Sequence, residues 1–260
     1  MDMKTQLQRL QKIFPHTWLE QLQYIHSSLL CRWILLRGSQ TLAFNQKSAM
    51  VFSPHQDDET FGCGGMIAHK REQGIPVIVV FLTDGQGSGG SVPNAQNNIV
   101  QIRQQEAIEA LSILGVEASE IHFLAKLDGS LQDLNNDDKQ QTIEQVSELI
   151  RCYQPGEVYV PHRKDCHKDH EATYKLVKAA IAQNNLIVDL LEYPIWLFWR
   201  SPLFILLKLD DLAAAYCFSI TSVQAKKKRA IASYKSQIES LPRGFIKRFL
   251  GSYEIFFKVD

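Results

Sequence analysis

The stretch AMVFSPHQDDETFGCGG, residues 49–65, passes from a short apolar run through a polar turn into the start of a helix. A stronger apolar run, PVIVVFLT at residues 76–83, follows it and is rich in β-branched residues, which favour strands. Shorter apolar runs lie at residues 120–124, 157–160 and 186–191, and amphipathic stretches that predict helices lie at residues 62–73, 98–114, 140–153 and 167–182. Strands that alternate with helices of this length predict βαβ units around a mostly parallel sheet, with right-handed crossovers.

The composition is that of an ordinary soluble globular protein. Of the 260 residues, 45% are hydrophobic and 22% are charged, which excludes a disordered chain. Lys plus Arg and Asp plus Glu both number 28, and this balance argues against a nucleic-acid-binding protein. The five cysteines include no C-x-x-C pair, so we expect neither a disulfide framework nor a zinc ribbon, and we expect a reducing, cytoplasmic location.

The chain is predicted to be one elaborated α/β domain, residues 47–260, preceded by an N-terminal helical extension, residues 1–46. The extension has the pattern of one or two amphipathic helices broken near Pro15. Its first residues carry no apolar core of a signal peptide, so we expect no such peptide. The apolar stretch 186–209 is interrupted by charges and two prolines, so we expect no membrane-spanning helix.

Side chains that can bind a metal follow the first predicted strand. His55 and Asp58 are three residues apart, with Asp57 between them and Glu59 next. Ligands bind α/β folds at the carboxyl ends of the strands, and imidazole nitrogen with carboxylate oxygen suits a catalytic zinc ion. Two aspartates also fit the acidic start of an ordinary helix, so this cluster alone leaves both interpretations open.

A second cluster, PHRKDCHKDHE at residues 161–171, follows another predicted strand. His167 and His170 are three residues apart near the start of a helix, so they can share one face. Catalytic zinc commonly takes three protein ligands, and His55, Asp58 and His170 would supply such a set. Basic residues are interleaved with these histidines, so a solvated, charged helix start is the alternative for this cluster taken alone.

The two clusters together resemble the signatures of a known family. PHQDDE, residues 54–59, is similar to the H-P-D-D-E signature of the PIG-L (LmbE-like) de-N-acetylases, with Gln56 in place of the proline. HKDH, residues 167–170, is similar to that family's H-x-D-H signature, and Asp165 precedes it. Weaker matches are TDG at residues 83–85, R-x-x-E-x-x-x-A-x-x-x-L-G at 103–115 and K-x-A-x-x-x-Y-x-S-Q at 228–237. The resemblance covers residues 47 to about 240.

The resemblance implies a Rossmann-like three-layer α/β fold, a Zn²⁺ cofactor and the removal of an acetyl group from an N-acetylglucosamine-type amino sugar, which is either a small molecule or lipid-linked. The resemblance implies these roles: His55, Asp58 and His170 as zinc ligands, Asp57 as the general base, His167 as the acid or oxyanion stabiliser, and Asp169 as the residue that orients His167. Apart from the resemblance, Arg103, Glu59 and the rim residue His162 are candidate substrate contacts. Two alternatives stay open, a metal-dependent amidase for another acylated amine and a sugar-binding relative without turnover.

Two weaker patterns each have two interpretations. GQGSGG, residues 85–90, has the spacing of a dinucleotide site, but the polar residues and Pro93 that follow indicate a loop. The basic run at residues 226–229 predicts a solvated helix face. Together with Trp196, Trp199 and RGFIKRF at 243–249, it alternatively predicts a patch that contacts a membrane surface.

Overall fold

The structure is a computed structural model that describes residues 16–87, 93–184, 186–200 and 214–259. One eight-stranded sheet runs through it in the order β1-β7-β8-β6-β5-β2-β3-β4. The strands are β1 (Ser39–Thr41), β2 (Ala49–Ser53), β3 (Val77–Thr83), β4 (Ile121–Lys126), β5 (Glu157–Pro161), β6 (Asp189–Tyr193), β7 (Ala215–Ser219) and β8 (Tyr253–Val259). Only β8 is antiparallel to its neighbours, β6 and β7, which confirms the mostly parallel α/β fold.

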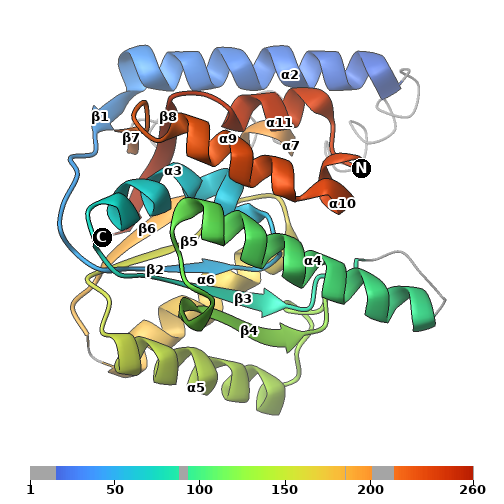
Figure 1. Cartoon of the computed structure of the whole chain (residues 1–260), viewed down its shortest axis with the longest axis vertical. Coiled ribbons are helices and arrows are strands. Elements are labelled where there is room, and N and C mark those ends of the chain that lie inside the picture. The colour runs from blue at the N-terminus through green and yellow to red at the C-terminus, as the bar shows by residue number, and fades with distance from the viewer. Residues whose placement is uncertain (1–15, 88–92, 185, 201–213, 260) are drawn as a thin grey trace, which may run out of the picture.

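Helices cover both faces of the sheet and complete a three-layer arrangement (Figure 1). The helices are α2 (His16–Trp33), which continues into a π-helical turn (Ile34–Gly38), α3 (Asp58–Glu72), α4 (Pro93–Leu114), a 3₁₀ turn (Ala118–Glu120), α5 (Asn136–Tyr153), α6 (Lys168–Asn184), α7 (Leu197–Arg200), α9 (Gln224–Ser233), α10 (Lys235–Ile238) and α11 (Arg243–Phe249). α5 and α6 lie on one face, whereas α3, α4 and α9 lie on the other.

The residues of strand β3 show that the sheet is buried on both faces. Val77, Val79 and Phe81 pack in the core beneath α3 and α4, whereas Ile78 and Val80 pack in the core beneath α5 and α6. All seven residues of this strand are buried. A continuous apolar run is the pattern expected of a parallel strand between two helical layers, because successive side chains point to opposite faces.

The five strands predicted from apolar runs are present as β2, β3, β4, β5 and β6. Three more strands, β1, β7 and β8, were not predicted. The first predicted helix begins at Asp58, four residues before the expected start at residue 62. The helix expected after Pro15 is α2, while the part of the extension before it lies outside the described residues.

The N-terminal extension packs onto the domain. Leu30 and Ile34 lie in a buried cluster with Phe198 and Phe257, and β1 pairs with β7 at the edge of the sheet. Residues 16–41 therefore share a core with the domain that follows them.

A buried ion pair between Lys227 and Glu254 bonds to backbone groups of helix α3. The Glu254 carboxylate of β8 accepts hydrogen bonds from the amides of Gly65 and Met66 (2.6 and 2.8 Å), and Lys227 Nζ donates to the Phe61 carbonyl (2.7 Å). Lys227 and Glu254 also contact each other at 2.6 Å, and both are buried. The last strand therefore satisfies backbone groups of the helix that begins at the candidate site.

The structure bears on the two weaker sequence patterns, the glycine-rich segment at residues 85–90 and the candidate membrane patch. Gly85 and Gly87 both have positive φ angles (69° and 80°), so the glycine-rich segment leaves β3 as a loop, and its continuation at residues 88–90 lies outside the described residues. Of the residues considered for a membrane patch, Lys227 and Trp199 are buried. Within the described residues, no helix is long and apolar enough to cross a bilayer.

Candidate active site

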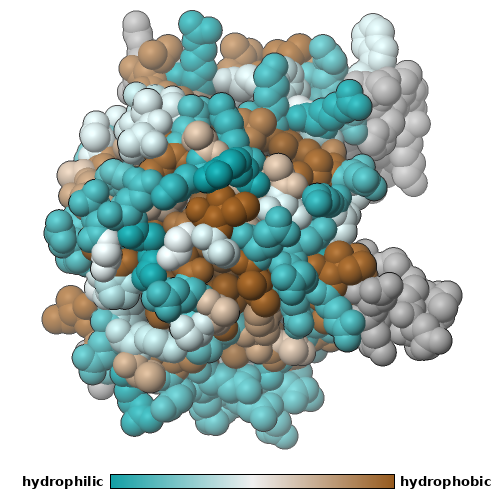
Figure 2. Space-filling view, viewed as in Figure 1, coloured by the Kyte–Doolittle hydropathy of each residue, from teal (hydrophilic) through white to brown (hydrophobic). Residues whose placement is uncertain are grey.

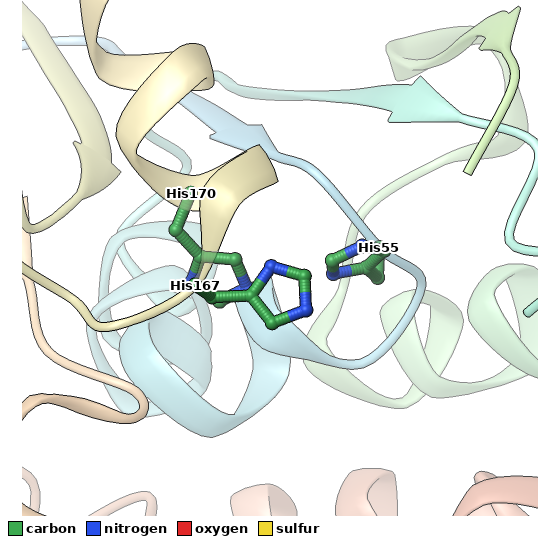
Figure 3. A group of neighbouring side chains, drawn as sticks. All are labelled: His55, His167 and His170. Carbon is green, nitrogen blue, oxygen red and sulfur yellow. The ribbon is translucent and has the colours of Figure 1, made fainter. Parts of the chain in front are cut away.

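The two polar clusters meet at one edge of the sheet. β2 and β5 are adjacent parallel strands, and His55 follows the first while His167 and His170 follow the second. The His55 ring centroid lies 4.9 Å from that of His167 and 5.4 Å from that of His170. Figure 3 shows the three imidazoles gathered between the start of α6 and the loop after β2. The two clusters predicted from the sequence therefore form one site.

The loop that carries His55 is fixed to strand β3. The Thr83 amide and hydroxyl both donate to the Pro54 carbonyl (3.1 and 2.6 Å), and Gln56 Nε2 donates to the Thr83 carbonyl (2.8 Å). Gln56, which replaces a proline of the family signature, thus ties the loop to the strand through its side chain. Gly85 makes this possible, because a Cβ atom there would lie 1.9 Å from Gln56 Oε1 and its φ is +69°.

His55 and His170 both approach the same carboxylate oxygen of Asp58. Asp58 Oδ2 lies 3.0 Å from His55 Nδ1 and 3.1 Å from His170 Nε2. In a tetrahedral zinc site with bonds of about 2.0–2.1 Å, neighbouring ligand atoms lie roughly 3.3–3.4 Å apart. His170 Nε2 is buried and has no hydrogen-bond partner, despite its short distance to Asp58. A buried nitrogen without a hydrogen bond, beside a second imidazole and a carboxylate, fits a metal ligand.

Asp165 orients His170. Its Oδ2 accepts a hydrogen bond from His170 Nδ1 (2.7 Å), and both side chains are buried. The carboxylate also accepts hydrogen bonds from three successive amides at the start of the segment leading to α7, those of Ile195, Trp196 and Leu197 (2.9–3.0 Å). Because Nδ1 carries the proton, Nε2 presents its lone pair to the ligand position.

The outer nitrogen of His55 faces two carboxylates. His55 Nε2 lies 3.2 Å from Asp169 Oδ2 and 3.1 Å from Asp128 Oδ1. Asp169 is held in turn by the amides of Gly129 and Leu131 (2.8 and 3.0 Å). This arrangement leaves Nδ1 of His55 for Asp58 and a shared ion.

The expected pairing of Asp169 with His167 is therefore replaced by a pairing with His55. The two amides of the turn after β4 draw the Asp169 carboxylate toward that turn. His167 Nδ1 is buried without a hydrogen-bond partner, and burial together with the neighbouring imidazoles of His170 and His55 lowers the pKa of His167 to about 4.

Asp57 and Asp58 are adjacent buried carboxylates with opposite pKa shifts. Burial, followed by the charge of Asp58, raises the pKa of Asp57 above its usual value. Burial alone would also raise the pKa of Asp58, but the His170 and His55 imidazoles hold it below its usual value. Asp57 also has a φ of 147°, a region of backbone conformation that non-glycine residues seldom adopt. Its placement beside the three converging side chains suits a base that is not itself a ligand.

The residues expected to contact substrate lie in three different environments. Glu59 is buried and accepts hydrogen bonds from the Tyr234 hydroxyl and the Asp57 amide. It therefore links the loop after β2 to Tyr234 and stabilises that loop. Arg103 donates to the Gly85 carbonyl (2.7 Å) and belongs to the site. His162 is not brought to the histidine cluster: it is buried against the Phe257 ring (centroids 4.8 Å apart), 3.6 Å from Glu192 Oε2.

Asp128 is a site residue that the sequence analysis missed. It follows β4, whose neighbour β3 lies beside β2, and its Oδ2 accepts a hydrogen bond from the Gly87 amide (3.0 Å) and lies 3.9 Å from Arg103 Nη1. Two groups of potential metal-ligating atoms lie within 4.8 Å of one another: His55, Asp128 and Asp169 form one, and His55, His167 and His170 form the other. The signal was its position, because an aspartate directly after a predicted strand lies at the same edge of the sheet as the histidines.

The sequence comparisons agree with this arrangement. The family model described as "PIG-L: GlcNAc-PI de-N-acetylase" matches residues 50–181, half of the chain. The chain is 29% identical to the "Uncharacterized deacetylase YaiS" of Escherichia coli K12, with 61% of this chain and 80% of that protein aligned. It is 26% identical to the "Probable N-acetyl-alpha-D-glucosaminyl L-malate deacetylase 2" of Bacillus anthracis, with 53% of this chain aligned to 61% of that protein, so the match leaves over a third of the Bacillus protein unmatched.

A structural comparison shows the same fold. The N,N'-diacetylchitobiose deacetylase of Pyrococcus horikoshii superposes with a TM-score of 0.63 at 21% identity, and the match covers 89% of this chain and 90% of that one. The eight-stranded sheet and its helices are thus an arrangement shared with a solved structure.

Proposed function

The chain belongs to the PIG-L family, and from this premise we propose that it is a zinc-dependent hydrolase that removes an N-acetyl group from an amino-sugar conjugate. The observation that carries the proposal is the convergence of His55 Nδ1 and His170 Nε2 on Asp58 Oδ2, with Asp57 and His167 beside them. The similar proteins support the substrate class, since their names refer to N-acetylglucosaminyl malate and diacetylchitobiose. An N-acetylglucosamine-type conjugate, soluble or lipid-linked, is the substrate we propose.

In this proposal His55, Asp58 and His170 hold the zinc ion. Two imidazole nitrogens and one carboxylate oxygen are a donor set that zinc accepts, and they leave a position open for water or substrate. When bound, zinc polarises the amide carbonyl and brings the pKa of water close to about 7. Asp165 and Asp169 act on the two imidazoles from outside, and they fix which nitrogen of each ring meets the ion.

Asp57 and His167 carry the proton transfers. Asp57 takes a proton from the attacking water as the water oxygen bonds to the amide carbon. Neutral His167 can donate a hydrogen bond to the oxyanion, and it can donate a proton to the nitrogen as the carbon–nitrogen bond breaks only if the developing negative charge raises its low pKa. Acetate and a free amine are the products. We also propose that Arg103 and Asp128, whose Nη1 and Oδ2 atoms lie 3.9 Å apart, contact sugar hydroxyls.

The remaining assignments rest on less specific observations. We assign catalysis to residues 47–260 and treat residues 1–46 as an extension. We also propose a cytoplasmic location, since the five cysteines include no C-x-x-C pair and do not suggest a disulfide framework.

An acetate-release assay combined with metal analysis tests the function. Purified protein is offered an N-acetylglucosaminyl conjugate, N,N'-diacetylchitobiose and an N-acetylated amine without a sugar. We expect acetate only from the sugars, loss of activity with a chelator, and recovery with Zn²⁺. Turnover restricted to the amine without a sugar would instead show another amidase, and zinc-replete protein that binds sugar without releasing acetate would show a sugar-binding relative.

A further inference from the structure

Helix α2 has two apolar faces that point in opposite directions. One face packs on the domain, where Leu30 and Ile34 contact the buried cluster of Leu197, Phe198 and Phe257. A helix at the edge of a soluble domain needs only this face to be apolar, and its other face is normally polar.

The opposite face carries a second apolar row, which we call the outer stripe. Its members are Trp18, Leu22, Ile25, Leu29, Trp33 and, in the turn after α2, Leu36. They are spaced by three or four residues, so they follow one line along the helix. Their exposed fractions run from 39% for Trp33 to 70% for Leu36. In Figure 2 hydrophobic residues appear along the upper edge, where Figure 1 places α2. Such a continuous exposed row marks an interaction surface.

The C-terminal helices, of which α11 packs against α2, are rich in basic residues. Residues 224–249, which span α9, α10 and α11, hold eight Lys and Arg and only one acidic residue, Glu239. Lys227 is buried against Glu254 and Lys226 pairs with Glu72, whereas five of the eight cations are exposed: Lys228, Arg229, Lys235, Arg243 and Lys247. α11 packs directly against α2: Lys247 Nζ lies 5.6 Å from the centroid of the Tyr24 ring, and a Cβ atom on Gly244 would lie 3.0 Å from the Tyr24 side chain. Arg243 and Lys247 are exposed there, and so is Arg32 of α2 itself.

This charge decides between two occupants of the outer stripe. Two copies joined through their outer stripes would bring two basic regions together, and like charges repel. A bilayer with anionic lipids accepts both the apolar row and the cations. Trp18 and Trp33 stand near the two ends of the row, and tryptophan favours the boundary between headgroups and acyl chains.

We propose that the outer stripe of α2 docks the protein on an anionic membrane surface, with the helix lying in the plane of the interface. The 18-residue helix is roughly 27 Å long at 1.5 Å per residue, long enough to place the whole row in contact with lipid. This inference is independent of the proposed function, since it uses no residue of the candidate active site.

Vesicle co-sedimentation of the full chain tests the docking. We use vesicles of phosphatidylcholine alone and vesicles in which roughly one third is phosphatidylglycerol. The protein is expected to sediment with the second, and Leu29→Gln is expected to weaken this binding by about tenfold. Ile187→Gln is the matched control, because Ile187 is fully exposed (102%) outside the outer stripe. Equal binding by these two variants, or no binding by the unmodified chain, overturns the proposal.

Charge and tryptophan emission give independent readouts. Arg243→Gln with Lys247→Gln is expected to lower binding to the anionic vesicles, and added salt is expected to do the same. The tryptophan emission of the full chain is expected to shift to shorter wavelength on these vesicles, and the shift is expected to shrink in a Trp18→Phe, Trp33→Phe variant. Trp199 is buried and would report no such change.

If a second copy of the chain covered the outer stripe, the mass of the protein in solution would show it. Without vesicles, analytical ultracentrifugation is expected to give the same mass for Leu29→Gln and the unmodified chain. A dimer that Leu29→Gln converts to a monomer would show that a second copy covers the outer stripe, and it would overturn the membrane assignment. Thermal unfolding of each variant shows that it is folded.

Discussion

Each of the two imidazoles that we propose as ion ligands has one nitrogen held by a carboxylate. Asp165 holds Nδ1 of His170, while Asp169 and Asp128 face Nε2 of His55. The two histidines thus use different ring nitrogens toward Asp58, and both choices are set by protein groups outside the ligand set.

Replacing Asp57 by asparagine is expected to lower the rate of acetate release by about 10²–10⁴-fold, because the amide cannot take the proton of the attacking water. Zinc content is expected to stay unchanged, since Asp57 is placed beside the ligands and not among them. Acetate release and metal content are measured on the same sample. Full activity in the variant would remove Asp57 as the base.

Asp165→Asn is expected to lower zinc affinity by about 10–100-fold, because an amide orients the His170 ring less firmly than a carboxylate does. Competition with a chromogenic chelator measures this. Asp133→Asn, a change at an exposed aspartate, is the control and should leave the affinity unchanged. An Asp165 variant with unaltered zinc affinity would contradict the orienting role.

Glu192 predicts a pH-dependent stability. Burial raises its pKa to about 7, with Arg163 opposing the shift. Because the folded-state pKa lies above the unfolded value, the folded state favours the protonated carboxyl, and stability falls as the pH rises from roughly 4.5 through 7. Glu192→Gln should therefore be more stable than the unmodified chain by about 1–3 kcal/mol at pH 8, and should lose this advantage at pH 5. Urea unfolding at both pH values measures the difference, and an advantage that does not change with pH would contradict it.

At the scale of elements, α3 is built to lie unusually close to its neighbours. A Cβ atom on Gly62 would lie 2.3 Å from the Tyr193 ring, and one on Gly65 would lie 2.4 Å from Ile220. The glycines after the first cluster therefore allow α3 to sit against β6 and the segment after β7, which places Asp58 at the start of the helix beside His170.

Gly65→Ala is expected to destabilise the fold by about 1–3 kcal/mol, because the added methyl group overpacks the contact with Ile220. Combining it with Ile220→Ala should cost less than the sum of the two single changes. Gly251→Ala is the control, since a Cβ atom there would have its nearest neighbour at 3.8 Å. Chemical denaturation of the set measures the free energies of unfolding, and strict additivity of the pair would argue against the close contact.

At the scale of the whole molecule, the proposed ion would join parts that are far apart in the chain. His55 and Asp58 come from the β2–α3 junction, whereas His170 comes from α6. Chelation is expected to lower the midpoint of thermal unfolding, and added Zn²⁺ should restore it, because a ligand that binds only the folded state stabilises it. Differential scanning calorimetry measures the shift. No change on chelation would show that the folded protein carries no ion that contributes to its stability.

Features that depend on neighbouring residues could be predicted from the sequence, whereas features that depend on contacts between distant residues could not. β2 and β3 were predictable because a strand buried on both faces is a continuous apolar run. β7 and β8 were not, because their pairing depends on residues far apart in the chain and their burial is uneven. In the site, two local clusters identified the candidate ligands, whereas the contact of Asp169 with His55 spans 114 positions and no spacing rule reveals it.

The position of β8 has a consequence for how the protein is made. It is the last of the described strands to leave the ribosome, yet it lies between β6 and β7 and supplies the Glu254 that completes α3. Until it emerges, a nascent chain exposes two unmatched strand edges and a helix with unbonded amides. The sheet around α3 can therefore be completed only after β8 has been synthesised, and the growing polypeptide exposes these groups until then.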